Sequence, residues 1–138
     1  MDITYKTENS LIAFLKNQSA TIGAMNVYGT KGDSPTTLPF IFVTVTKATE
    51  LVNGTNAFKV EGVIQLVSEI YDTPTAVHQT LLDAIKPVLD TLWQNCPWVD
   101  TANQVAWSGI DVGSLQSRDS TADKAHADIW TFNAGVSG

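Results

Sequence analysis

The stretch FIFVTVT at residues 40–46 is the clearest strand in the sequence, and the rest of the fold can be worked out from it. Every residue in it is β-branched or aromatic, and these residue types favour extended backbone. Successive side chains of a strand point to opposite sides, so the stretch has two faces. One face carries Ile41, Val43 and Val45, and the other carries Phe40, Phe42, Thr44 and Thr46.

A second and longer strand is expected at residues 57–70, where apolar and polar side chains alternate. Phe58, Val60, Ile64 and Leu66 lie on one face of this strand. The intervening residues 47–57 contain Asn53-Gly54, a strong turn signal. The two strands are therefore predicted to form a long antiparallel hairpin, with Gly62 marking a bulge or bend.

Helical patterns flank this hairpin. Residues 7–17 predict a short N-terminal helix with Thr7 as its cap. A small strand is expected within residues 23–29, and residues 29–39 are expected to form a loop. After a start signal at Asp72-Thr73-Pro74, apolar residues recur every three or four positions, which predicts an amphipathic helix over residues 75–93, bent at Pro87.

The last third of the chain predicts two strands, Gln104–Ser114 and Lys124–Asn133, joined by a loop. In the second of these, His126, Asp128, Trp130 and Phe132 share one face. The order of elements indicates an α+β fold with a mostly antiparallel sheet. A length of 138 residues fits a single domain over residues 1–138.

Composition excludes several classes of protein. The 12 aromatic residues exclude a disordered acidic chain, and the single cysteine excludes a disulfide scaffold. No apolar run approaches the ~18 residues of a membrane span, so no membrane partner is expected. The net charge is −6, and the only arginine, Arg118, stands in no basic cluster. Specific nucleic-acid binding is therefore not expected.

No catalytic signature is present: the chain has no G-x-S-x-G, H-E-x-x-H or C-x-x-C motif. Ser117, His126 and Asp119 could be combined into a triad, but in a chain with many serines and acids such a choice carries little weight. The acids near His126 lack the glycine-turn loop of calcium sites. We therefore expect no enzyme activity, no metal and no cofactor.

Two features point instead to contacts between proteins. Apolar residues at a hairpin tip usually need a partner, although the tip could also fold back on its own domain. Tryptophan is enriched in interfaces, although core packing is the alternative for each. The expected interface residues are Glu50, Leu51, Val52, Asn53, Gly54, Trp98 and Trp107.

The order of segments resembles the tail terminator (tail completion) proteins of long-tailed bacteriophages, over about residues 8–133. The resemblance is carried by Leu38-Pro39 before the first long strand, by the junction Val67–Pro74, and by the helix and strand pair that follow. It implies a hexameric ring at the head-proximal end of the tail tube, which stops tube polymerisation and meets neck or head-closure proteins. It also implies subunits that pair through sheet edges and extended loops, with no catalytic residues.

The same resemblance implies a virion protein of the tail or neck that is assembled in the host cytoplasm. It would contact the tail tube protein, and the tail sheath if the tail is contractile. DNA would pass through the ring without specific binding, so we expect acids at the lumen or rim: Asp111, Asp119, Asp123 and Asp128. The alternatives are a head–tail connector or neck subunit, and a small cytosolic ligand-binding domain.

Overall fold

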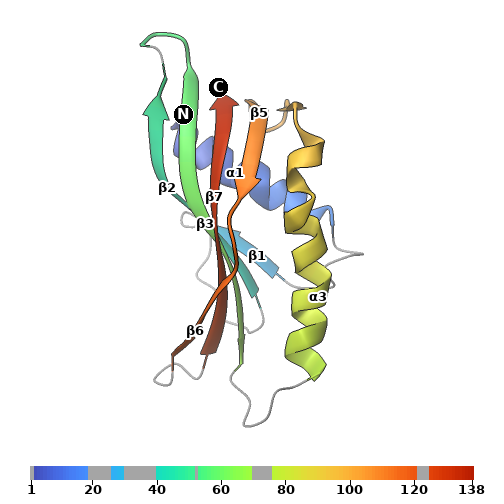
Figure 1. Ribbon diagram of the computed structural model, residues 1–138. Helices are drawn as coiled ribbons and strands as arrows, with labels where there is room; N and C mark the ends of the chain where they lie inside the picture. The colour runs from blue at the N-terminus through green and yellow to red at the C-terminus, as the bar shows by residue number, and fades with distance from the viewer. Residues whose placement is uncertain (1, 19–25, 30–39, 52, 70–75, 121–124) are drawn as a thin grey trace.

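The computed structural model describes residues 2–18, 26–29, 40–51, 53–69, 76–120 and 125–138. The fold is α+β, with a 7-stranded, mostly antiparallel sheet in the order β1-β2-β3-β7-β5-β4, and β6 paired to β7 (Figure 1). Among the described strand pairs, β1 and β2 run parallel and the others are antiparallel. The strands are β1 (Asn26–Gly29), β2 (Phe40–Glu50), β3 (Ala57–Glu69), β4 (Trp98–Asp100), β5 (Val105–Val112), β6 (Gln116–Ser120) and β7 (Ala125–Ser137).

The predicted hairpin is confirmed as β2 and β3, which pair from Phe40 opposite Val67 to Glu50 opposite Phe58. It is longer than expected, because β2 continues to Glu50 and the tip is reduced to residues 51–56. A bulge lies in β2 between Val45 and Lys47, beside Gly62 of β3.

Gly62 has no room for a side chain. A Cβ there would lie 2.6 Å from the ring of Phe132 and would also overlap the carbonyl oxygen of Thr44. The sharp bend in the hairpin and the packing of Phe132 therefore both depend on this glycine.

β7 is the central strand of the C-terminal third. One side of it pairs with β3 along its whole length. The other side pairs with β5 over Phe132–Ser137 and with β6 over Ala125–Ile129. The expected loop over residues 113–123 is therefore wrong in part, since β6 occupies its middle. The short strand β4 was not predicted, because three residues are too few to show an alternating pattern.

The N-terminal helix α1 spans Ile3–Lys16 and begins four residues earlier than expected. Asp2 is its cap, with Oδ1 accepting from the Thr4 N–H at 3.1 Å. Thr7, the expected cap, is buried within the helix instead. Asp2 provides the same capping chemistry further upstream and so lengthens the helix.

The second helix, α3, spans Ala76–Asp90 and is followed by a 3-10 turn, η1, over Leu92–Asn95. The predicted start at Asp72-Thr73-Pro74 lies outside the described residues. In the part of α3 with described side chains, Ile85 and Leu89 are buried while Asp83 and Lys86 are exposed. Amphipathic character over the whole of residues 75–93 stays a prediction.

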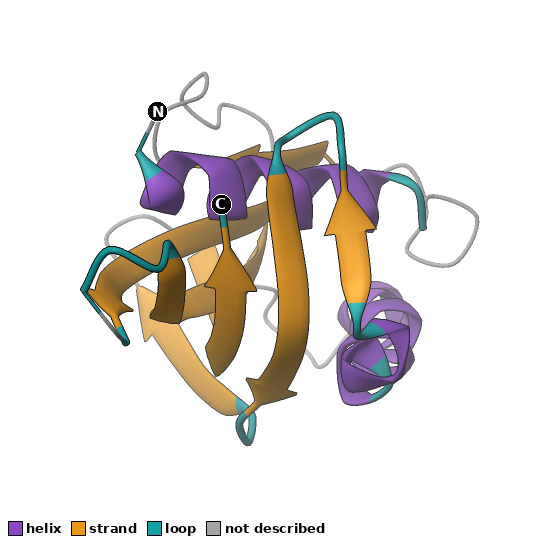
Figure 2. Ribbon diagram, turned by 90° about the horizontal axis from the view of Figure 1, so that it is seen from above, coloured by secondary structure: helices purple, strands orange, loops and turns teal. Residues whose placement is uncertain are grey.

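The core lies on one face of the curled sheet, beneath α1 (Figure 2). The predicted alternation is confirmed in β3 over Val60–Ser68 and in β7 over Asp128–Val136, where every second residue is buried, while in β2 it is limited to Ile41 and Val43. The largest side chains that are fully buried are Trp130, Phe132, Leu11, Leu15, Ile41, Ile64, Leu66, Ile85 and Leu89. Within the described residues, neither helix combines the length and apolar character needed to cross a bilayer.

Candidate interaction surfaces

The hairpin tip projects from the sheet and is held in a defined shape (Figure 1). The Leu51 N–H donates to the Ala57 carbonyl at 2.8 Å, and the Gly54 N–H donates to Glu50 Oε1 at 3.1 Å. Gly54 adopts φ +84°, which a glycine tolerates without strain. Glu50 thus orders the turn, while the Leu51 side chain is 62% exposed.

The tip does not fold back far enough to cover Leu51. The C-terminal Gly138 N–H donates to the Asn56 carbonyl at 3.1 Å and so fixes the base of the turn. Asn53 and Gly54 are exposed, and Val52 lies outside the described residues. An ordered tip with an exposed leucine can present that side chain to a partner at little cost in conformational entropy.

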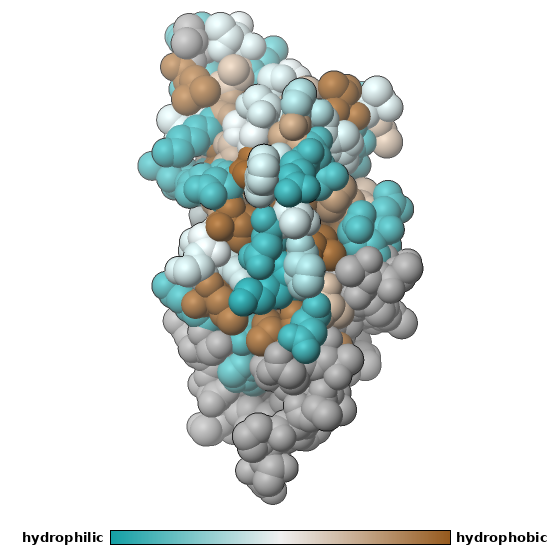
Figure 3. Space-filling view, turned by 45° about the vertical axis from the view of Figure 1, so that its right-hand side comes forward, coloured by the Kyte–Doolittle hydropathy of each residue, from teal (hydrophilic) through white to brown (hydrophobic). Residues whose placement is uncertain are grey.

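A shallow hollow of about 410 Å³ lies beside the tip on the open face of the sheet. Leu51 and Lys59 border it, and its other lining comes from Gly109–Asp111 of β5 and Asn133–Gly135 of β7. Gly109 is paired with Gly135, so bare backbone forms part of the hollow. On the face shown in Figure 3, apolar side chains are scattered among polar ones.

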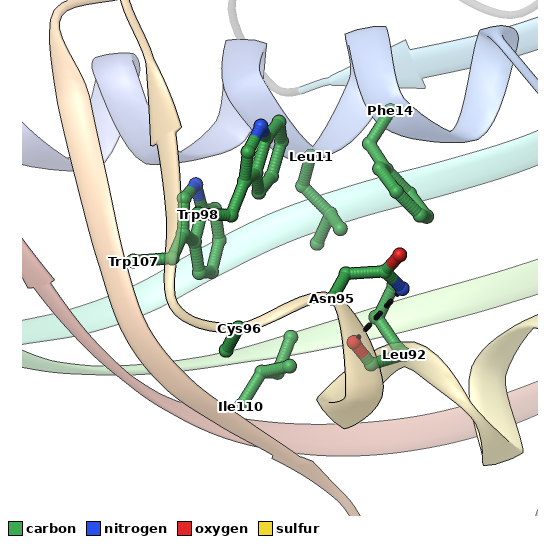
Figure 4. A pocket seen from close by; sticks show the side chains of 8 residues that line it. All are labelled: Leu11, Phe14, Leu92, Asn95, Cys96, Trp98, Trp107 and Ile110. Carbon is green, nitrogen blue, oxygen red and sulfur yellow. Dashed lines mark hydrogen bonds between the residues drawn. The ribbon is translucent and has the colours of Figure 1, made fainter.

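The two tryptophans expected at an interface take part in one aromatic cluster. Trp98 and Trp107 stack at 5.7 Å between ring centroids, and Trp98 also contacts Phe14 at 5.4 Å (Figure 4). Trp107 is only 2% exposed, so it has almost no surface to offer a neighbouring subunit. Trp98 is half-buried and keeps some exposed surface that a neighbouring subunit could contact.

A void of about 10 Å³ lies within this cluster, bordered by Cys96 and Ile110 among others (Figure 4). It has room for about one water molecule at most. Burial raises the pKa of the Cys96 thiol, which disfavours the reactive thiolate. Nothing here resembles a ligand site.

A hydrogen-bond network links the aromatic cluster to α1. Ser10 Oγ donates to Asp100 Oδ2 at 2.7 Å and accepts from Trp107 Nε1 at 2.9 Å. Asn103 donates to both carboxylate oxygens of Asp100. Burial alone would raise the pKa of Asp100, but hydrogen bonds from Asn103, Ser10 and the Ala102 backbone outweigh it, and the pKa is lowered.

The four acids expected at a rim do not form one group. Asp111 is exposed beside the hollow, whereas Asp128 is 1% exposed and therefore cannot contribute to a rim as expected. Its Oδ1 lies 3.1 Å from His126 Nε2. The reason is the strand alternation, which puts Asp128 on the buried face with Trp130.

The exposure of the other two acids, Asp119 and Asp123, cannot be compared with that of Asp111, because their side chains lie outside the described part of the chain. The backbone of Asp119 lies opposite His126 in the β6–β7 pair, and Asp123 lies outside the described residues. Over the described ranges, no group of three His, Cys, Asp or Glu side chains is arranged to hold a metal ion.

Sequence reasoning missed two other exposed apolar residues, Trp93 of η1 and Val99 of β4, which are 60% and 67% exposed. Trp93 stands at the end of the predicted helix, and the sequence leaves both core packing and an interface open for it, as for each tryptophan. The strand containing Val99 was itself not predicted. The sequence carries no signal that separates these side chains from core residues.

The sheet has two edges at which another strand could add. Among the described residues, β1 pairs with β2 from Phe40 to Val43. At the opposite side of the described sheet, β4 pairs with β5 from Val105 to Trp107, and β7 is the one described partner of β6. Uncovered strand edges present backbone donors and acceptors to other chains.

No protein-family model matches the chain, and no curated protein matches it. Its fold does match those of solved structures. One is a chain of a structure described as the virion of a native gene transfer agent (GTA) particle, with a TM-score of 0.56 and 18% sequence identity. The match covers 88% of this chain and 84% of that chain, so the two share a fold over nearly their whole lengths.

Proposed function

We propose that this chain is a structural virion protein that forms a ring on the head-proximal end of a phage tail tube. The ring stops tube polymerisation and joins the tail to the neck. The observation that supports this most is the fold shared with a virion chain over 88% of the residues. It agrees with the segment order that resembles tail terminator proteins.

The surfaces described above suit such a role. A ring of identical subunits needs two different patches on each subunit, because each contact joins unlike surfaces head to tail. The projecting tip with Leu51 and the hollow that it borders beside Gly109 and Gly135 form one such patch. The edges of β2 and β6 that no described strand covers provide a second patch of backbone donors and acceptors.

The charge of the chain also suits a passage for DNA. Six copies of a chain with net charge −6 would form a strongly acidic assembly, and a lumen of that sign would not retain phosphates. Asp111 is the exposed acid that we propose for the lumen or rim. The ring would be a hexamer without enzyme activity, located in the tail or neck of the virion.

A second candidate is a head–tail connector or neck subunit. The matching structure is a whole virion, and its description does not restrict the matched chain to one position in the particle. A small ligand-binding domain is less favoured, since the hollow beside the tip and a second hollow of about 310 Å³ beside Phe14 and Pro87 are both open to solvent, and the void in the aromatic cluster is only about 10 Å³.

Tube assembly with and without this protein separates these functions. A terminator should bind one end of purified tail tubes and hold their length uniform, as seen by negative-stain electron microscopy. A connector should leave tube length uncontrolled and bind head or neck components instead. A protein that binds neither, and stays monomeric with both, would contradict the proposal.

A further inference from the structure

Helix α1 joins the two edges of the sheet. On one side, Glu8 Oε2 accepts the Val45 N–H of β2 at 3.1 Å. Ser10, two residues along and therefore on the opposite side of the helix, bonds to Asp100 of β4 and to Trp107 of β5. The sheet curls beneath the helix, so α1 fills the gap between its edges (Figure 2).

Glu8 lies beside the last described pair of the β1–β2 ladder. That pair is Gly29 with Val43. A Cβ on Gly29 would come within 2.9 Å of Glu8 Oε1 and 2.7 Å of Ile12 Cδ1. The glycine thus leaves room for the carboxylate, and the next outward N–H of β2, that of Val45, bonds to Glu8 rather than to a strand.

Beyond Val45, the outer edge of β2 has no partner strand in the part of the chain that the structure describes. The Leu51 N–H points toward β3, since it donates to Ala57. Because N–H groups alternate in direction along a strand, those of Ala48 and Glu50 point away from β3. No strand among the described residues pairs with them. Along β2, the Val45 N–H that is bonded to Glu8 is therefore followed by a short stretch, Ala48–Glu50, whose outward N–H groups no described strand pairs.

We propose that Glu8 is an edge stop that limits strand addition on β2. A strand from a second copy of this chain can add along Ala48–Glu50, and the carboxylate on Val45 prevents it from extending toward β1. The choice of a second copy rests on the proposed function and on β6, a strand of the same chain for which β7 is the one partner strand among the described residues. Pairing of unlike edges propagates from copy to copy, so limiting its length keeps free subunits from polymerising.

The stop can be tested by comparing Glu8→Ala with Glu8→Gln. Both variants remove one negative charge, but glutamine keeps an oxygen that can accept the Val45 N–H. Sedimentation velocity should show concentration-dependent association for Glu8→Ala that exceeds that of the wild type and of Glu8→Gln. The proposal is overturned by a folded Glu8→Ala variant that associates no more than the wild type. It is equally overturned by a Glu8→Gln variant that associates as strongly as Glu8→Ala.

Hydrogen exchange of single amides provides a second measurement, which also decides the matter if Glu8→Ala does not fold. Hydrogen bonds to a charged acceptor are about twice as strong as neutral ones. The Val45 amide should therefore exchange about tenfold faster in Glu8→Gln than in the wild type, while Val43 is unchanged. A wild-type Val45 amide that exchanges as fast as those of Ala48 and Glu50 would refute the proposal, because Glu8 would then not hold this N–H. This rate is measured on free subunits, so it is independent of whether the protein caps tail tubes.

Discussion

Replacing Asp100 with alanine should destabilise the protein in a manner that depends on pH. The carboxylate accepts three side-chain and backbone donors from Ser10 and Asn103, at 2.7, 2.9 and 3.1 Å. Bonds of this kind contribute about 1 kcal/mol or more each, less where water can replace the lost partner. Since Asp100 is partly exposed, we expect a total loss of about 2 kcal/mol at neutral pH, or a decrease in Tm of about 7 °C.

The pKa of Asp100 is lowered in the folded state from its ordinary value of 3.8. Its stabilising contribution is therefore complete above pH 3.8 and is lost as the pH falls through the lower folded pKa. Urea unfolding of wild type and Asp100→Ala should give free energies that differ at neutral pH and converge in acid. Asp111→Ala, which removes an exposed acid, is the matched control and should change stability little. A difference that persists unchanged at low pH would refute this account of the network.

Three further predictions concern the hairpin and the rim. Gly62→Ala should lower the free energy of unfolding by about 2 kcal/mol or more in a urea titration, because the added methyl group overlaps Phe132. Leu51→Asp should leave stability nearly unchanged but abolish capping of tail tubes in electron micrographs, whereas Val99→Asp, an equally exposed change on β4, should cap normally. Asp111→Lys should slow DNA ejection from assembled particles, and unchanged ejection would contradict a place for this acid at the lumen.

The strands could be predicted well because their evidence is local. In β3, in β7 and at the start of β2, buried residues alternate with less buried ones, and this pattern needs no knowledge of the neighbours. The same pattern placed Asp128 beside Trp130 on the inner face. Because Asp128 is charged, it was nevertheless expected at an exposed rim. Its burial shows that the alternation along the strand predicts its position better than its charge does.

The interfaces could not be predicted as well, because they depend on what the fold leaves uncovered. Trp98 and Trp107 are alike in sequence, yet one keeps some exposed surface and the other is 2% exposed. Trp107 also donates to Ser10 of helix α1, a contact that joins distant parts of the chain. No local pattern carries that information.

Glu8 is the most instructive of these residues. An acid near the start of a predicted helix is usually explained by the helix dipole, and that interpretation would make Glu8→Gln and Glu8→Ala nearly equivalent. The structure places the residue inside a longer helix, where it bonds to a strand 37 positions away. A helix-dipole role predicts equal, small losses of helix stability in the two variants and no change at Val45. An edge stop predicts that the two variants differ in self-association and that the exchange rate of the Val45 amide changes. This pair of variants therefore distinguishes a local explanation of Glu8, the helix dipole, from a tertiary one, the bond to β2.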